Sequence, residues 1–135
     1  MTEFNDAAQA HYAVQDYSPK TPIADVEIVQ LRRFNDDGGA MTELGRLDGG
    51  LHKDLPGFEV RQVNYSVVEP LATKAFHLHK RQTDVWYVPP TDRMLVVLHD
   101  CREGSPTEGE TMRLMLGDGQ SRLLRIPPGV AHGCT

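Results

Sequence analysis

Three histidines fall in patterns that could support chemistry. His77 and His79 are two residues apart, so on a strand their side chains would share one face. His132 follows the turn sequence Pro127-Pro128-Gly129. An imidazole titrates near neutral pH and can therefore move protons, and it is also a common ligand of transition metals. The pattern indicates a site at which strands bring imidazoles together.

A row of alternating polar side chains precedes these histidines in the chain. We expect residues 58–68 to form a strand. Its two faces would be polar and apolar, carrying Gln62, Asn64 and Ser66 on one side and Val63, Tyr65 and Val67 on the other. The polar row fits either the wall of a pocket shared with the histidines or a solvated outer face over an apolar core.

Short apolar segments separated by turn residues make up most of the chain. Twelve glycines and nine prolines interrupt the apolar runs, and no run with helical period is long enough to predict a core helix. We expect strands at residues 26–32, 58–68, 73–79, 85–88, 93–99, 111–116 and 122–126. Many short strands with frequent turns predict an all-β sandwich or closed barrel over residues 26–135, preceded by an N-terminal arm over residues 1–25.

Bulk composition excludes several classes of function. The chain has 135 residues, the size of one domain, and a formal net charge of −5, which argues against nucleic acid as a partner. The longest apolar run, residues 94–98, is too short to cross a membrane, and the N-terminus does not resemble a secretory signal. We therefore expect a cytoplasmic protein whose two cysteines, Cys101 and Cys134, are free thiols.

Five segments, in order, resemble the motifs of the dTDP-4-dehydrorhamnose 3,5-epimerase family. They are residues 36–43 (Asp-Asp-Gly-Gly-Ala-Met-Thr-Glu), 62–66 (Gln-Val-Asn-Tyr-Ser), 74–79 (Lys-Ala-Phe-His-Leu-His), 102–109 (Arg-Glu-Gly-Ser-Pro-Thr-Glu-Gly) and 126–133 (Ile-Pro-Pro-Gly-Val-Ala-His-Gly). The resemblance covers residues 26–134 and rests on the order and spacing of the whole set. It implies a cupin fold, which is a double-stranded β-helix or jelly-roll barrel.

The resemblance also implies an activity, namely inversion of carbons next to the C4 ketone of a 4-keto-6-deoxy sugar carried on a nucleotide. Such an enzyme removes a proton α to the carbonyl and returns one to the opposite face. The family's catalytic base corresponds to His77. Its substrate contacts correspond to Glu43, Gln62, Asn64, Lys74 and His132. No cofactor is implied, and family members are usually homodimers.

Three departures from the family pattern bear on this activity. The arginine of the first motif is Gly38, and the arginine that holds the diphosphate is Lys74, which keeps the charge without the bidentate fork. The family's lysine near the ketone aligns at about Val85, beside Asp84. The family's tyrosine acid lies beyond the last motif, whereas this sequence ends at Thr135, so we expect a barrel cut short at its C-terminus.

Other functions fit the same histidines. Metal-binding cupins carry a His-x-His pair, a nearby carboxylate and a later histidine, which His77, His79, Asp84 and His132 match. That set would suit a divalent iron, manganese or zinc ion. A related 3,4-ketoisomerase is a further alternative, because such enzymes carry a His-x-His-Lys strand like residues 77–80. An inactive binding cupin is the last alternative, and the epimerase remains the main hypothesis.

Overall fold

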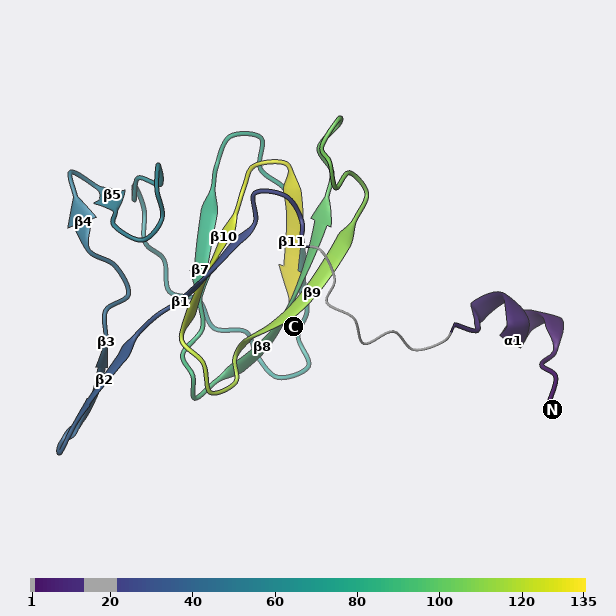
Figure 1. Ribbon diagram of the computed structural model, residues 1–135, viewed down its shortest axis with the longest axis horizontal. Helices are drawn as coiled ribbons and strands as arrows, with labels where there is room; N and C mark the ends of the chain where they lie inside the picture. The colour runs from purple at the N-terminus through teal and green to yellow at the C-terminus, as the bar shows by residue number, and fades with distance from the viewer. Residues whose placement is uncertain (1, 14–21) are drawn as a thin grey trace.

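The computed structural model describes residues 2–13 and 22–135, whose regular secondary structure is almost entirely β (Figure 1). Within these residues the elements, in chain order, are α1 (Asp6–His11), β1 (Glu27–Gln30), β2 (Arg33–Asp36), β3 (Gly39–Thr42), β4 (Leu47–Asp48), β5 (Leu51–His52), β6 (Lys74–His77), β7 (Asp84–Tyr87), β8 (Arg93–Asp100), β9 (Thr111–Gly117), β10 (Arg122–Ile126) and β11 (Val130–Cys134). The expected all-β architecture is confirmed.

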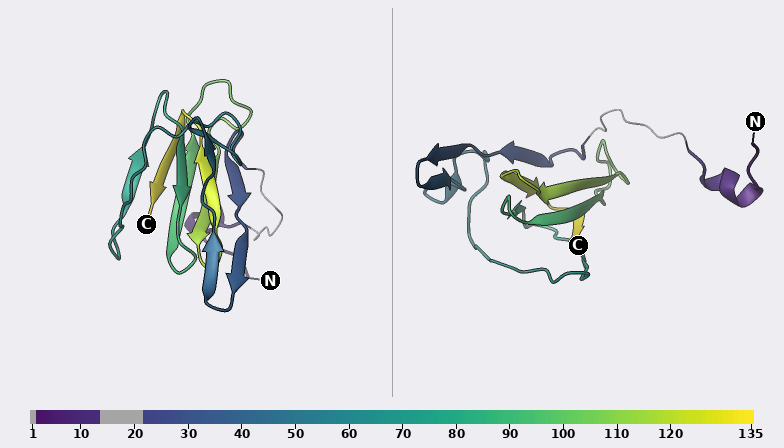
Figure 2. Two further views of the ribbon diagram at one scale, coloured as in Figure 1. Left: turned by 90° about the vertical axis from the view of Figure 1, so that its left-hand side faces the viewer. Right: turned by 90° about the horizontal axis from the view of Figure 1, so that it is seen from below.

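Two antiparallel sheets form the barrel (Figures 1 and 2). One has the strand order β1-β10-β7 and the other the order β6-β11-β8-β9. Two small hairpins, β2–β3 and β4–β5, stand beside the barrel in Figure 1. Because most neighbours in each sheet are distant in sequence, loops cross repeatedly between the sheets, as in the cupin jelly roll predicted for this chain.

The main core lies between the two sheets. Alternation along the strands turns apolar side chains from both sheets inward, among them Val96, Leu98, Leu116, Leu124, Ile126 and Val130, each at most 1% exposed. Complete burial of one such side chain stabilises the fold by about 1.5–3 kcal/mol. A smaller cluster of Leu31, Leu55 and Leu123 covers the opposite face of β10. The three-stranded sheet is therefore packed on both faces.

The structure corrects one expected strand and adds five that were not expected, namely β2, β3, β4, β5 and β11. Residues 58–68 do not form a strand, apart from an isolated bridge between Leu51 and Glu59. The segment alternates in hydrophobicity, but no described strand pairs with its remaining length, and Val63 and Tyr65 are 84% and 88% exposed. Residues 130–134, which sequence analysis treats only as the motif after a turn, form β11 in the interior of the four-stranded sheet.

The N-terminal arm expected over residues 1–25 falls partly on residue 1 and residues 14–21, which lie outside the described residues. Asn5 caps α1 by accepting a hydrogen bond from the backbone N–H of Ala8 at 2.9 Å, and no residue of α1 is buried. Ile23 is 2% exposed and packs into the main core. In the described part of the chain, no helix has the length and apolarity needed to cross a membrane.

Candidate functional site

The site is centred on His132, which β11 turns into the barrel. Val130, His132 and Cys134 alternate along β11 and all face the interior, where His132 is 2% exposed. In the neighbouring strands, His132 lies opposite His77 of β6 and Leu98 of β8. The position of β11 between these strands therefore brings an imidazole of one sequence motif beside that of another.

Three aromatic rings surround the His132 imidazole. The ring centroids of His77 and His132 are 6.1 Å apart with an interplanar angle of 20°, and those of His79 and His132 are 5.3 Å apart. Trp86 of β7, in the opposite sheet, makes an edge contact with His132 at 5.3 Å. Trp86 was not among the predicted site residues, although alternation along β7 places it on the same inward face as Asp84.

Asp84 lies between two of the imidazoles. Its Oδ2 atom is 3.2 Å from Nε2 of His132 and 3.5 Å from Nε2 of His79. Its Oδ1 atom accepts a hydrogen bond from the Gln82 side chain at 2.6 Å. The side chains of His79 and Asp84 are 30% and 18% exposed, so the group lies at the edge of the core and remains accessible.

A backbone contact orients the His132 ring. Nδ1 of His132 is 3.0 Å from the carbonyl oxygen of Val130. Because a carbonyl oxygen only accepts, Nδ1 carries the proton and donates this bond. The other ring nitrogen, Nε2, therefore lies toward the Asp84 carboxylate.

The structure brings some of the predicted site residues together and leaves others apart. His77, His79, Asp84 and His132 meet, although the group whose ligating atoms all lie within 4.8 Å of one another comprises His79, Asp84 and His132 and leaves out His77. The predicted substrate contacts have other partners. Glu43 pairs with Arg46 at 2.9 Å, Gln62 donates to Asn64 at 3.3 Å, and Lys74 donates to the Val67 carbonyl at 3.3 Å.

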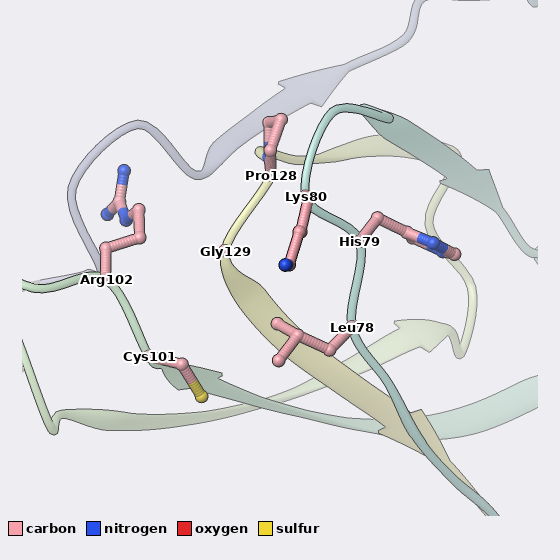
Figure 3. Close-up of a pocket in the computed structure, with 7 residues that line it drawn as sticks. All are labelled: Leu78, His79, Lys80, Cys101, Arg102, Pro128 and Gly129. Atoms are coloured by element: carbon pink, nitrogen blue, oxygen red, sulfur yellow. The ribbon is translucent and has the colours of Figure 1, made fainter.

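A cleft of about 500 Å³ adjoins the histidine cluster on the other side of the His79 backbone (Figure 3). Its lining includes Leu78, Lys80, Cys101 and Arg102. In Figure 3 the ring of His79 points away from Cys101 and Arg102, while Leu78 lies on their side. The cleft and the imidazoles therefore occupy opposite sides of this chain segment, and the imidazoles face the barrel interior.

The motif of residues 102–109 is built around Asp100, which is 1% exposed. The Asp100 carboxylate accepts from Ser105 and Thr107, each at 2.7 Å, and from Arg102 at 2.9 Å through its Nε. Chiefly because Arg102 donates to it, the pKa of Asp100 lies well below its usual range, and the pKa of Arg102 is raised in return. Arg102 also donates to Asp25 at 2.7 Å. Asp100, which was not among the predicted site residues, holds this loop in place.

Both cysteines are unpaired in the structure. Cys101 is exposed and Cys134 is buried. Burial raises the pKa of the Cys134 thiol. Cys101 lines the cleft and Cys134 packs into the main core, so neither thiol belongs to the cluster. The reactive groups of the cluster are therefore its histidines and its carboxylate.

Comparison with known proteins gives consistent matches. The family model for dTDP-4-dehydrorhamnose 3,5-epimerase matches residues 20–135. The spore coat polysaccharide biosynthesis protein SpsL of Bacillus subtilis (strain 168) is 40% identical over 111 residues, which are 82% of this chain and 70% of that protein. A dTDP sugar isomerase from Desulfovibrio desulfuricans G20 has a TM-score of 0.71 at 34% identity, covering 87% of this chain and 72% of that one. The rmlC epimerase of Mycobacterium tuberculosis has a TM-score of 0.68 at 26% identity, covering 85% and 58%.

The matched region contains all five motifs found in the sequence. These matches favour the epimerase hypothesis over the three alternatives, which were a metal-dependent cupin enzyme, a 3,4-ketoisomerase and an inactive binding protein. They also agree with the observed jelly-roll barrel.

Proposed function

The chain belongs to the dTDP-4-dehydrorhamnose 3,5-epimerase family of isomerases, and from this premise we propose that it inverts carbons adjacent to the C4 ketone of a nucleotide-linked 4-keto-6-deoxy sugar. The observation that carries the proposal is the pairing of His77 with His132 across β6 and β11. These residues come from two different family motifs, and the fold places their rings 6.1 Å apart.

In this proposal His77 is the catalytic base. It is an exposed residue at the end of β6, where a substrate can reach it. Neutral imidazole accepts the proton from the carbon next to the ketone, and the electron pair of the broken C–H bond moves to the C4 oxygen as an enolate. Return of a proton to the opposite face completes the inversion. His132, buried behind His77, contributes to the wall against which the sugar ring lies.

The remaining predicted contacts fit binding of the nucleotide part. Lys74 begins β6, on the same strand as the proposed base, and its exposed ammonium group suits a diphosphate oxygen as a point charge. Gln62 and Asn64 are exposed amides on the adjoining segment, and Glu43 lies on the connection after β3. We propose that these side chains, which pair with one another or with nearby chain in the free protein, turn to the substrate when it binds.

Solvent deuterium exchange at C3 and C5 of dTDP-4-keto-6-deoxyglucose tests the role of His77. We expect the wild type to exchange these positions and His77→Asn to be slower by about 10²- to 10⁴-fold, the usual contribution of a general base. His11→Asn, on the exposed helix α1, is the matched control and should exchange at the wild-type rate. Unchanged exchange in His77→Asn would disprove the assignment of the base.

We also propose that the chain is a homodimer, as expected from the resemblance. The support is a set of large apolar side chains left exposed around residues 63–78, comprising Val63, Tyr65, Val67, Leu71, Phe76 and Leu78. Exposed apolar patches of this kind usually mark an interface. In addition, β1 and β6 are edge strands whose outer sides have no described partner strand, and such edges can pair with another chain.

Sedimentation equilibrium tests the dimer directly. We expect a mass of twice the 15.1 kDa chain. Tyr65→Lys should shift the protein toward monomer, because it places a charge on the exposed apolar segment, whereas Phe4→Lys on the N-terminal residues should not. A wild type that sediments as a monomer at all concentrations would rule the proposal out.

A further inference from the structure

We propose that His79, Asp84 and His132 form a binding site for a divalent first-row transition metal ion such as Zn²⁺, Fe²⁺ or Mn²⁺. The ligating atoms of these three residues all lie within 4.8 Å of one another. They come from different parts of the fold, namely the segment after β6, the start of β7 and the middle of β11. Two imidazoles and one carboxylate are a donor set that such ions prefer, and it leaves coordination positions open.

The distances from Asp84 agree with those around a bound ion. Ligand atoms at about 2.0–2.1 Å from a tetrahedral metal stand roughly 3.3–3.4 Å from one another. Oδ2 of Asp84 is 3.2 Å from Nε2 of His132 and 3.5 Å from Nε2 of His79. An ion could therefore enter between these three atoms with only small movements of the side chains.

His132 presents one ring nitrogen to the other two groups. Nδ1 of His132 donates to the Val130 carbonyl at 3.0 Å, which leaves Nε2 as the ring atom that an ion could bind. Nε2 lies 3.2 Å from Oδ2 of Asp84, and the buried ring is 2% exposed, so packing fixes its orientation. A metal ion between these atoms would be bound by His132, Asp84 and His79 at the same time.

Outer contacts hold each ligand in place, as they do in metal sites. The Val130 carbonyl orients His132, and Gln82 donates to Oδ1 of Asp84 at 2.6 Å, which leaves Oδ2 for the ion. The backbone carbonyl of His79 accepts from the N–H of Gly129 at 2.9 Å. This bond ties His79 to the turn that precedes β11, and so to the strand that carries His132.

A metal ion at this position would also serve the proposed reaction, a point that rests on the proposed function. An ion held by His79, Asp84 and His132 would place positive charge beside His77, where it could bind the C4 oxygen. His77 is not a ligand, so it stays free to take the proton while the enolate oxygen is stabilised.

Cobalt binding tests the site without any sugar. We expect chelator-treated wild type to bind about one equivalent of Co²⁺, with new visible absorption bands and a raised melting temperature. Asp84→Asn and His79→Ala should weaken binding by more than the roughly 10- to 100-fold that loss of an outer contact costs. Gln82→Ala, which removes such a contact, should fall within that range, and His11→Ala should bind as the wild type does.

Circular dichroism of the metal-free proteins shows whether weakened binding in Asp84→Asn reflects only a lost fold. Asparagine has nearly the same size and shape as aspartate, so the metal-free variant should keep the spectrum of the metal-free wild type. Wild type that binds no Co²⁺, or Asp84→Asn that binds it equally well, overturns the metal site. Because binding is measured without substrate, a metal-loaded protein that fails to exchange deuterium would refute the proposed function alone.

Discussion

Replacement of Asp100 by asparagine should destabilise the barrel by about 3 kcal/mol. The carboxylate is 1% exposed and accepts hydrogen bonds from the backbone and guanidinium of Arg102 and from the hydroxyls of Ser105 and Thr107. In asparagine an NH₂ group replaces one of the carboxylate oxygens. This NH₂ group is itself a donor, and the guanidinium of Arg102 cannot accept a hydrogen bond from it. Removing one partner of a buried ion pair typically costs about 3–5 kcal/mol. We expect the lower end, since the Arg102 side chain is 21% exposed and keeps Asp25 as a partner.

Urea titrations of wild type and Asp100→Asn, at the same protein concentration, measure this difference in the free energy of unfolding. For a chain of this size, about 3 kcal/mol corresponds to a fall of roughly 10 °C in melting temperature. Asp118→Asn is the matched control, because Asp118 pairs with Arg93 only at the surface and at 3.5 Å. It should change stability by no more than about 1 kcal/mol. If Asp100→Asn also stays within about 1 kcal/mol of wild type, the Asp100 network does not stabilise the fold as argued.

Three further outcomes follow from the same structure. The pKa of Asp100 is lower in the folded protein than in the unfolded chain, so the carboxylate stabilises the fold above the unfolded pKa of about 3.9 and this contribution is lost as the pH falls below that value. The melting temperature of wild type should therefore fall more steeply than that of Asp100→Asn between about pH 4 and 2. Ellman's reagent should titrate the exposed Cys101 in the native protein and the buried Cys134 only in urea, since burial raises the pKa of Cys134; two fast thiols in the native state would contradict this. Gly117→Ala should destabilise the protein more than Gly119→Ala, although both glycines have positive φ. A Cβ at position 117 would lie 2.7 Å from the Pro89 carbonyl oxygen, whereas one at position 119 meets no atom within 4 Å, so equal melting temperatures of the two variants would refute this.

The sequence was most informative where a signal is local. Alternation and turn residues located β8, β9 and β10 to within about one residue, because each strand has one face in the main core. The same signal failed for residues 58–68, since alternation reports which face could be buried and not whether another strand is available to pair. The interior place of β11 depends on pairing with β6 and β8, which lie far away in sequence.

The site was predictable to a similar degree. Motif spacing identified the histidines and Asp84, and strand pairing brought them together. The contact of Trp86 with His132 and the hydrogen bond at Nδ1 of His132 could not be read from spacing, because they depend on the opposite sheet and on a backbone carbonyl two residues away. The partners of Glu43, Gln62 and Lys74 in the free protein were equally outside the reach of motif analysis.

The two faces of strand β7 have different contacts, one in the site and the other in the second apolar cluster. Asp84 and Trp86 face the imidazoles, while Val85 and Tyr87 pack into the second apolar cluster on the other side. Trp86 also packs against the main core, so variation at position 84 can alter chemistry while 85, 86 and 87 keep the strand anchored. A library randomised at position 84, with an aromatic residue kept at 86, should yield folded barrels with altered sites, which makes β7 a practical starting point for changing what this scaffold does.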